Sequence, residues 1–232
     1  DGLRASESDR LRRQDKPPLT GPLVYGRAAR NGDGRSWLQY WLFFADNTQD
    51  RGIVRTGRHT GNWELMQIRL AQDGMPVEVT LAQHTWAQGC RWSRMERVGE
   101  APVIYVANGS HALLSRPGTS DRPFPDPNDE ADGQGRRVRP PLEPITADSP
   151  RWMSWPGRWG ASEAGFVPGE QPSPRGPAFQ PERWNDPGRF HATQALGCGS
   201  GPPARHWQTA LTVFVALLLA GGLLIAARSY NR

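Results

Sequence analysis

Hydrophobic and polar residues alternate along the first half of the chain in a pattern that predicts β-strands. Strand candidates lie at residues 22–29, 36–44 and 58–70, and the aromatic-rich SWLQYWLFF of the second candidate is typical of a central strand. The turn sequence NGDG joins the first two candidates and favours a β-hairpin. We therefore expect sequential strands to pair in an antiparallel sheet.

The third candidate is expected to form a second hairpin with residues 76–84, PVEVTLAQH. Asp73 and Gly74 lie between the two and suit a two-residue type I′ turn. Such a turn fixes the register of the two strands. The predicted register places side chains of matching character opposite one another: Met66 and Leu81, Gln67 and Thr80, Ile68 and Val79, Arg69 and Glu78, and Leu70 and Val77.

The rest of the chain adds one strand and many loops. PVIYVA, residues 102–107, predicts another buried strand, whereas residues 115–206 show no regular pattern. The 26 glycines and 22 prolines favour long connections over long helices. We predict an all-β fold, an antiparallel β-sandwich with long loops rich in Pro, Gly and Trp, over residues 21–195.

An uncharged apolar run, ALTVFVALLLAGGLLIAA at residues 210–227, is long enough to cross a bilayer. Trp207 and Tyr230 flank it as aromatic residues typical of membrane interfaces. The run predicts a single C-terminal transmembrane helix and a membrane localisation. The predicted segments around the sandwich domain are a polar linker at 1–20, a second linker at 196–206, the helix at 207–229 and a short tail at 230–232.

The arginines around the apolar run are nearly balanced between its two ends, so they only weakly indicate on which side of the membrane the domain lies. Arg228 and Arg232 follow the apolar run, and Arg205 precedes it closely. This distribution leans toward a cytoplasmic tail and a domain outside the cytoplasm. Insertion after synthesis, with the domain inside, also fits, and Asp1 in place of an initiating methionine leaves any upstream signal outside the sequence.

The chain carries a net charge of +5, and almost all of its basic residues are arginine. They are scattered apart from RLRR at 10–13 and RRVR at 136–139, and no Arg/aromatic recognition signature accompanies them. This argues against a nucleic-acid partner. The basic residues form either an ordinary solvated surface or one attracted to anionic lipid headgroups or phosphorylated ligands.

The two cysteines, Cys90 and Cys198, exclude a disulfide-rich scaffold and a zinc site built on a Cys-x-x-Cys motif. One disulfide would form if the domain faces an oxidising compartment. Two unrelated free thiols are the alternative.

A carboxylate on the apolar face of the third strand is the first candidate for chemistry. The predicted register places Glu64 opposite Gln83, at the end of that face, with Asn62 one step further out. His59 precedes them in GRHTG, where glycines let the chain bend. A converging His59, Asn62 and Glu64 would suit a hard or borderline divalent cation, with Ca²⁺ or Mg²⁺ favoured over Zn²⁺. The alternative is a Glu64–arginine pair beside an ordinary loop histidine.

Two further histidines are candidates for catalysis with Glu64. His84 falls opposite Trp63, which in an ideal register puts it on the other face of the sheet from Glu64. His111 follows ANGS at a strand end, where it could serve function or only a tight turn. The loop DPNDEADG, residues 126–133, has spaced oxygen ligands, but its register is wrong for a calcium loop and a solvated acidic turn is favoured.

Four sequence blocks, taken together, resemble a known family. LQYWLFFADN, HTGNWELMQIRL, AQHTW and PVIYVANGSHALLSRPGT occur in the order found in the vacuolar-protein-sorting-62-like family, over roughly residues 22–190. A more distant similarity links the chain to the necrosis-inducing peptide-like toxins. The resemblance implies a β-sandwich, and the toxin family's metal-binding H-x-x-D-x-E spacing falls here on His59, Asn62 and Glu64. Asn62 stands where both families have aspartate, which removes one charge; Asp46 or Asp50 could restore it.

These observations support three hypotheses, and the first is favoured. The domain is a membrane-anchored binding module that recognises a polar lipid headgroup, a glycan or a protein partner, with a divalent cation as a candidate cofactor. The second is a hydrolase that acts on an ester or phosphoester with Glu64 and with His59, His84 or His111. The third is a trafficking or scaffold protein without a chemical site.

Overall fold

The computed structural model describes residues 22–48, 50–51, 54–55, 59–84, 86–122, 128–147, 149–160 and 172–198. Within these ranges no helix has both the length and the apolar character needed to cross a membrane. The predicted linker at 1–20, the predicted transmembrane helix at 207–229 and the tail at 230–232 lie outside the described residues, as does most of the linker at 196–206.

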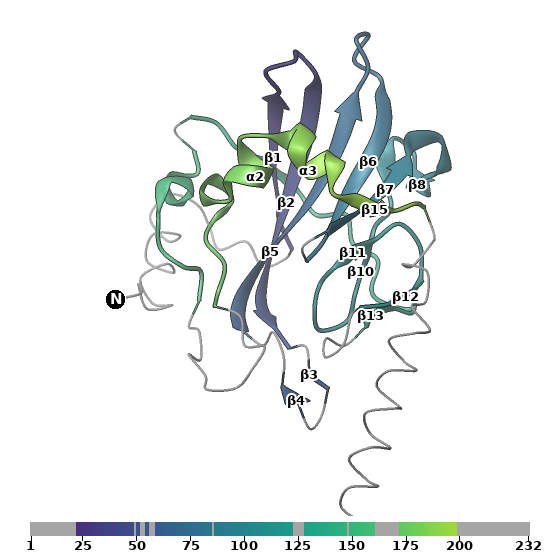
Figure 1. Cartoon of the computed structure of the whole chain (residues 1–232), viewed down its shortest axis with the longest axis vertical. Coiled ribbons are helices and arrows are strands. Elements are labelled where there is room, and N and C mark those ends of the chain that lie inside the picture. Colours follow the sequence, from purple (N-terminus) through teal and green to yellow (C-terminus); the bar gives the residue numbers. More distant parts are fainter. Residues whose placement is uncertain are drawn as a thin grey trace, which may run out of the picture.

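The prediction of a β-rich fold is confirmed, since one large sheet organises the described chain (Figure 1). Its strand order is β14-β1-β2-β5-β6-β7-β15, and β2 is an interior strand as expected. Neighbouring strands are antiparallel except at the two edges, where β14 pairs with β1 and β15 with β7 in parallel. The seven strands are β1 (Val24–Arg30), β2 (Ser36–Asn47), β5 (His59–Leu70), β6 (Pro76–Gln83), β7 (Trp86–Arg91), β14 (Leu142–Pro144) and β15 (Gln194–Leu196).

Short ribbons and single helical turns complete the described structure. The ribbons are β3 (Asp50–Arg51) with β4 (Val54–Arg55), β8 (Arg97–Val98) with β9 (Ala101–Pro102), β10 (Tyr105–Val106) with β11 (Leu113–Leu114), and β12 (Gly118–Ser120) with β13 (Asp129–Ala131). The helical turns are η1 (Trp92–Arg94), η2 (Arg151–Ser154), η3 (Pro177–Phe179), α2 (Pro181–Trp184) and α3 (Pro187–Ala192). The single buried strand expected over 102–107 is wrong, because that segment divides between two ribbons and leaves Val106 exposed.

The two long hairpins have the same turn, and it differs from the predicted type I′ turn. In each, the amide of the final glycine donates to the carbonyl three residues earlier, from Gly74 to Ala71 and from Gly34 to Asn31. Only that glycine has positive φ, at 83° in both cases, so each turn is type I followed by a left-handed glycine. The extra residue shifts the register, and Leu70 pairs with Pro76 instead of Val77. The other four predicted pairs are confirmed.

Both faces of the sheet are buried, which explains why β5 has buried residues in succession from Gly61 to Ile68. One face carries Trp41, Trp63 and Leu65 and packs against tryptophans of η2 and α2 and against Phe190 of α3. Figure 1 shows α2 and α3 crossing the strands on this side. The opposite face carries Met66, Ile68 and Leu81 and packs against Leu113 of β11.

Buried glutamines of the sheet form hydrogen bonds with the segments that pack on its two faces. Gln39 donates to the carbonyl of Arg183 at 2.7 Å, and Gln67 donates to that of Pro187 at 2.8 Å, so two strands bind the segment of α2 and α3. On the other face Gln83 donates to Leu113 at 3.0 Å and accepts from Ser120 at 3.1 Å. These bonds satisfy polar groups that would otherwise be buried at a cost.

Cys90 of β7 and Cys198 form a disulfide, which decides between the two alternatives that the sequence left open. The bridge closes a loop of 108 residues and ties the described end of the chain to the sheet. Loops of this length gain about 4–5 kcal/mol from a native disulfide in the chain-entropy account. The described fold therefore extends to Cys198, slightly beyond the predicted domain boundary at residue 195.

Candidate functional site

A polar cavity of about 490 Å³ opens where β5 and β6 stop pairing. In the described strands their ladder ends at Met66 and Leu81, although the preceding residues of β5 continue to pair with β2. The gap admits side chains from the segment of α2. The cavity is lined by Asn47 of β2, by His59, Asn62, Trp63 and Glu64 of β5, by His84, and by Pro174, Gln180, Pro181, Glu182 and Arg183.

Glu64 is the least solvated charged group of this cavity, with only 5% of its surface exposed. It pairs with Leu42 of β2 and not with Gln83, so the predicted pairing of Glu64 with Gln83 is not formed. Burial is the largest cause that raises its pKa from 4.5 to about 8, and the charge of Asp129 adds to this, whereas Arg183 and Asn62 oppose it. The side chain is therefore mostly protonated at pH 7.

One oxygen of Glu64 is paired and the other is not. Oε1 accepts a hydrogen bond from the amide of Asn62 at 3.1 Å. Oε2 is buried and has no hydrogen-bond partner among the described residues. A buried polar atom left unpaired is costly, and such atoms in native proteins point to strain or to a group that is bound there in function.

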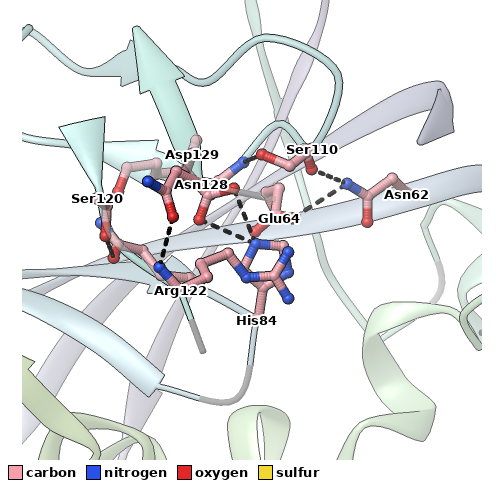
Figure 2. A network of polar contacts seen from close by, with 11 residues as sticks. Asn62, Glu64, His84, Ser110, Ser120, Arg122, Asn128 and Asp129 are labelled. Carbon is pink, nitrogen blue, oxygen red and sulfur yellow. Dashed lines mark hydrogen bonds and ion pairs between the residues drawn. The ribbon is translucent and has the colours of Figure 1, made fainter. Parts of the chain in front are cut away.

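Asn62 directs its amide nitrogen into the site (Figure 2). This nitrogen donates to Glu64 and to the carbonyl of Ser110 at 2.8 Å, and both contacts are buried. Ser110 belongs to the turn that precedes β11, so Asn62 links β5 to the covering layer. Asn62 and Glu64 are in contact, and in this contact Asn62 is a hydrogen-bond donor and not the oxygen ligand that the sequence predicts.

His84 lines the same cavity as Glu64, although an ideal continuation of the β6 register would put it on the other face of the sheet. β6 ends at Gln83, and His84 takes a left-handed backbone conformation with φ 54°, which turns the side chain away from the ideal strand direction. Its Nε2 lies 3.0 Å from both carboxylate oxygens of Asp129, which is completely buried. Figure 2 shows the histidine ring facing this carboxylate below Glu64.

Sequence reasoning missed two residues of the site, Asp129 and Arg183. Asp129 belongs to DPNDEADG, which was expected to be a solvated acidic turn, and its only signal was its place among the four acidic residues of that segment. Arg183 donates to the carbonyl of His84 at 2.7 Å and lies close enough to Glu64 to lower its pKa. Nothing in the local pattern ERW distinguishes Arg183, because its position depends on the contacts that Gln39 and Gln67 make with the α2–α3 segment.

The remaining sequence candidates lie at different distances from the cavity centre. His59 lines the cavity, with Nδ1 2.8 Å from the carbonyl of Gly61, and burial lowers its pKa, so the ring is neutral at pH 7. His111 does not line the cavity and instead stacks on Phe44 with ring centroids 4.1 Å apart. Asp46 is exposed and pairs with Thr60 in the β2–β5 ladder. The structure therefore joins His59, Asn62, Glu64 and His84 in one cavity. His111 and Asp46 lie outside its lining, although both the charge of Asp46 and that of His59 act on the pKa of His111.

The arrangement of side chains in the cavity offers few ligands to a divalent cation. Among the described residues no group of three or more His, Cys, Asp and Glu side chains could hold a metal ion. Glu64 is mostly neutral, Asn62 presents its nitrogen to Glu64, and the guanidinium of Arg183 lies nearby. Hard cations need anionic or carbonyl oxygens, so we derive no step through a metal. Cation binding through His59, Asn62, Glu64 and Asp46 stays a prediction.

Asn62→Asp is expected to create the cation affinity that this arrangement lacks. The added carboxylate would face Glu64 and favour a bound Ca²⁺ or Mg²⁺ over two protons. A thermal-shift titration with each metal should stabilise Asn62→Asp and leave the parent chain unchanged, and Asn62→Ala serves as the control. Equal stabilisation of the parent chain and abolition by Glu64→Gln would contradict the arrangement described above.

Comparisons with known proteins show no family for this chain. No protein-family model and no curated protein matches the chain, so the vacuolar-protein-sorting-62-like resemblance stays a resemblance. Similar solved structures are "Toxin fold for microbial attack and plant defense" (15% identity, TM-score 0.37, 54% of this chain and 52% of that chain), "NLPPya in complex with glucosamine" (14%, 0.37, 62% and 58%), and "Toxin fold as basis for microbial attack and plant defense" (16%, 0.36, 56% and 54%).

These structures are necrosis- and ethylene-inducing peptide-like toxin-fold proteins, and the distant sequence similarity to that group stays a resemblance. The matched region spans slightly more than half the length of each. At this level of identity and overlap, the likeness carries no conclusion about what the present chain binds.

Proposed function

We propose that the cavity at Glu64 binds a polar, uncharged, hydroxyl-bearing ligand such as a glycan or the sugar-like part of a lipid headgroup. The unpaired, buried Oε2 of Glu64 carries this proposal. A protonated carboxyl group both donates and accepts hydrogen bonds, which matches a hydroxyl group and not a full charge.

The other groups in the cavity support the same class of ligand. Asn47 and Gln180 bring amides, neutral His59 brings an acceptor at Nε2 because its Nδ1–H donates to the carbonyl of Gly61, and Trp63 adds an aromatic surface. Few convergent polar groups on a largely preformed concave surface are typical of small-ligand sites. The proposal does not include a bound cation, because it requires a neutral Glu64 and a cation would favour the ionised form.

The predicted membrane anchor and location belong to the same proposal. The apolar run at 210–227 would hold the domain at a bilayer. The Cys90–Cys198 disulfide supports a domain that faces an oxidising compartment outside the cytoplasm. A membrane-anchored binding module exposed on that side would meet glycans and headgroups of the same surface.

Glutamine in place of Glu64 is expected to preserve binding, and leucine to weaken it. The glutamine side chain would keep a donor and an acceptor, whereas a leucine leaves the ligand's hydroxyl group and one amide hydrogen of Asn62 unpaired. The loss should be about 1–3 kcal/mol, or roughly 5- to 150-fold in Kd. The full chain in lipid nanodiscs would be applied at pH 6.5 to an array of neutral glycans and to myo-inositol, with Kd measured for each hit. Absence of any hit, or equal binding by Glu64→Leu, would contradict the proposal.

A second candidate function, ester or phosphoester hydrolysis, is favoured by the His84–Asp129 pair. Asp129 holds Nε2 of His84 and would orient the ring, which leaves Nδ1 to accept a proton from an attacking water molecule. Glu64 would give its proton to the leaving oxygen, and Arg183 would stabilise the developing negative charge. Glu64→Gln separates the two functions, because it cannot supply this proton. Turnover of generic esters or phosphodiesters that Glu64→Gln abolishes would favour the hydrolase.

A further inference from the structure

Two surface segments, neither of which lines the cavity at Glu64, meet at Glu96. Glu96 joins them, since Tyr105 donates to its Oε2 at 2.6 Å and Arg137 lies 3.8 Å from its Oε1. β8 and β9 pair within the first segment. We call this surface the Arg/Val face, and it consists of Arg91, Arg94, Arg97, Val98, Val106 and residues 136–139.

The Arg/Val face carries arginines that the protein itself does not neutralise. Within the described part of the chain, no ion pair engages Arg91, Arg94, Arg136 or Arg139, and Arg97 lies over the ring of Trp92 at 5.4 Å. Two exposed arginines elsewhere, Arg35 and Arg189, have carboxylate partners in Asp33 and Glu182, whereas Arg30, Arg151 and Arg175 lie apart from one another in the sequence and form no such cluster. A cluster of unneutralised arginines is expected to attract an anionic surface.

The same face is also apolar to an unusual degree. Among the described residues, five large hydrophobic side chains are exposed, and three of them belong here: Val98 at 64%, Val138 at 48% and Val106 at 37% exposure. Apolar groups bordered by cations suit the boundary of a lipid bilayer, where headgroups meet the cations and acyl chains accept the apolar groups.

The disulfide fixes this face close to the point from which the chain continues toward its apolar run. Cys198 is bonded to Cys90, and Arg91 follows Cys90 directly. Residue 210, where the run begins, lies twelve residues after Cys198 in the sequence. Twelve residues reach at most about 40 Å. Any bilayer that holds the run is therefore within a short tether of the Arg/Val face.

We propose that the Arg/Val face rests on an anionic bilayer surface and orients the domain against the membrane that its C-terminal segment enters. This inference rests on the proposed membrane anchor. It does not depend on the cavity at Glu64, which is built from other residues. The valines enter the headgroup region and the arginines contact phosphates or other anionic groups of the lipid.

Hydrogen exchange of the full chain in nanodiscs tests this proposal without a label. We expect slower exchange for peptides covering residues 91–106 and 133–140 in discs of 30% phosphatidylserine than in discs of phosphatidylcholine alone, and high salt should remove the difference. The triple variant Arg94→Ser, Arg136→Ser, Arg139→Ser should lose it as well. Each arginine near an anionic surface strengthens association about fivefold, so three would account for roughly 100-fold.

A matched variant removes the same number of charges elsewhere. Arg30→Ser, Arg151→Ser, Arg175→Ser changes exposed residues at the end of β1, in η2 and near η3, and it should keep the protection. Equal exchange in the two lipids, or equal loss in both triple variants, would overturn the proposal. A chain that fails to enter the discs would instead refute the anchor, and the proposal with it.

Discussion

Glu64→Gln is expected to stabilise the protein at pH 7 by on the order of 3 kcal/mol, although it removes a functional side chain. The folded protein keeps Glu64 protonated up to a pKa of about 8, whereas an unfolded chain releases that proton near 4.5. The stabilisation linked to this proton is therefore fully present below pH 4.5 and is lost as pH rises from about 4.5 to about 8. Glutamine has no proton to release, so the variant does not lose stability through this range.

Denaturant or thermal unfolding of both proteins from pH 4 to pH 9 measures this difference. The two should be similar near pH 4 and diverge as pH rises, with the variant about 6–12 °C higher in Tm at pH 7. The difference between the proteins isolates Glu64, because His59, His111 and His191, whose pKa values burial lowers, change stability equally in both as pH falls below about 6.5. A difference that stays constant with pH would show that Glu64 is ionised in the folded state.

Gly61→Ala is expected to destabilise the protein by about 4 kcal/mol or more. Gly61 has φ 72°, and a methyl group there would collide with the backbone carbonyl of Trp159. A flexible side chain could move aside, but a backbone carbonyl in the aromatic cluster of Trp63, Trp152 and Trp159 cannot do so cheaply. The change would also displace His59 and Asn62, which flank Gly61 in the cavity wall.

Gly74→Ala provides the control, because its φ of 83° imposes similar backbone strain in open space. It should cost only about 1–2 kcal/mol, the strain of a left-handed conformation. Unfolding free energies of the two variants, measured together, give the contribution of the contact with Trp159. Equal losses would show that the 159–160 segment does not pack against the start of β5 as described.

The sequence predicts the sheet well where local pattern decides it. Turn residues and alternation place β1, β2, β5 and β6, and the register of Met66 with Leu81 and Ile68 with Val79 follows from them. The register is wrong only next to the turn, where Leu70 pairs with Pro76, because the turn that forms has one residue more than the predicted turn. The prediction of one buried strand at 102–107 is wrong because the apolar residues of this segment belong to two ribbons.

The candidate site was only half visible, because half of it comes from distant segments. Glu64, Asn62 and His59 share one strand, so their spacing reveals them. Arg183 arrives through hydrogen bonds that Gln39 and Gln67 donate, and polar residues on alternate strand positions normally indicate a solvent-facing side. His84 reaches the cavity through a left-handed backbone, which histidine adopts more often than most residues but which the strand pattern of residues 76–84 does not indicate.

Ligand affinity measured against pH tests the central claim, that a protonated Glu64 binds a hydroxyl-bearing ligand in this cavity. For any glycan or inositol hit, the parent chain should bind well at pH 6 and weaken as pH rises through about 8, while Glu64→Gln should bind equally at pH 6 and pH 9. Affinity of the parent chain that is unchanged or stronger at pH 9, with loss of binding in Glu64→Gln at both values, would contradict the claim.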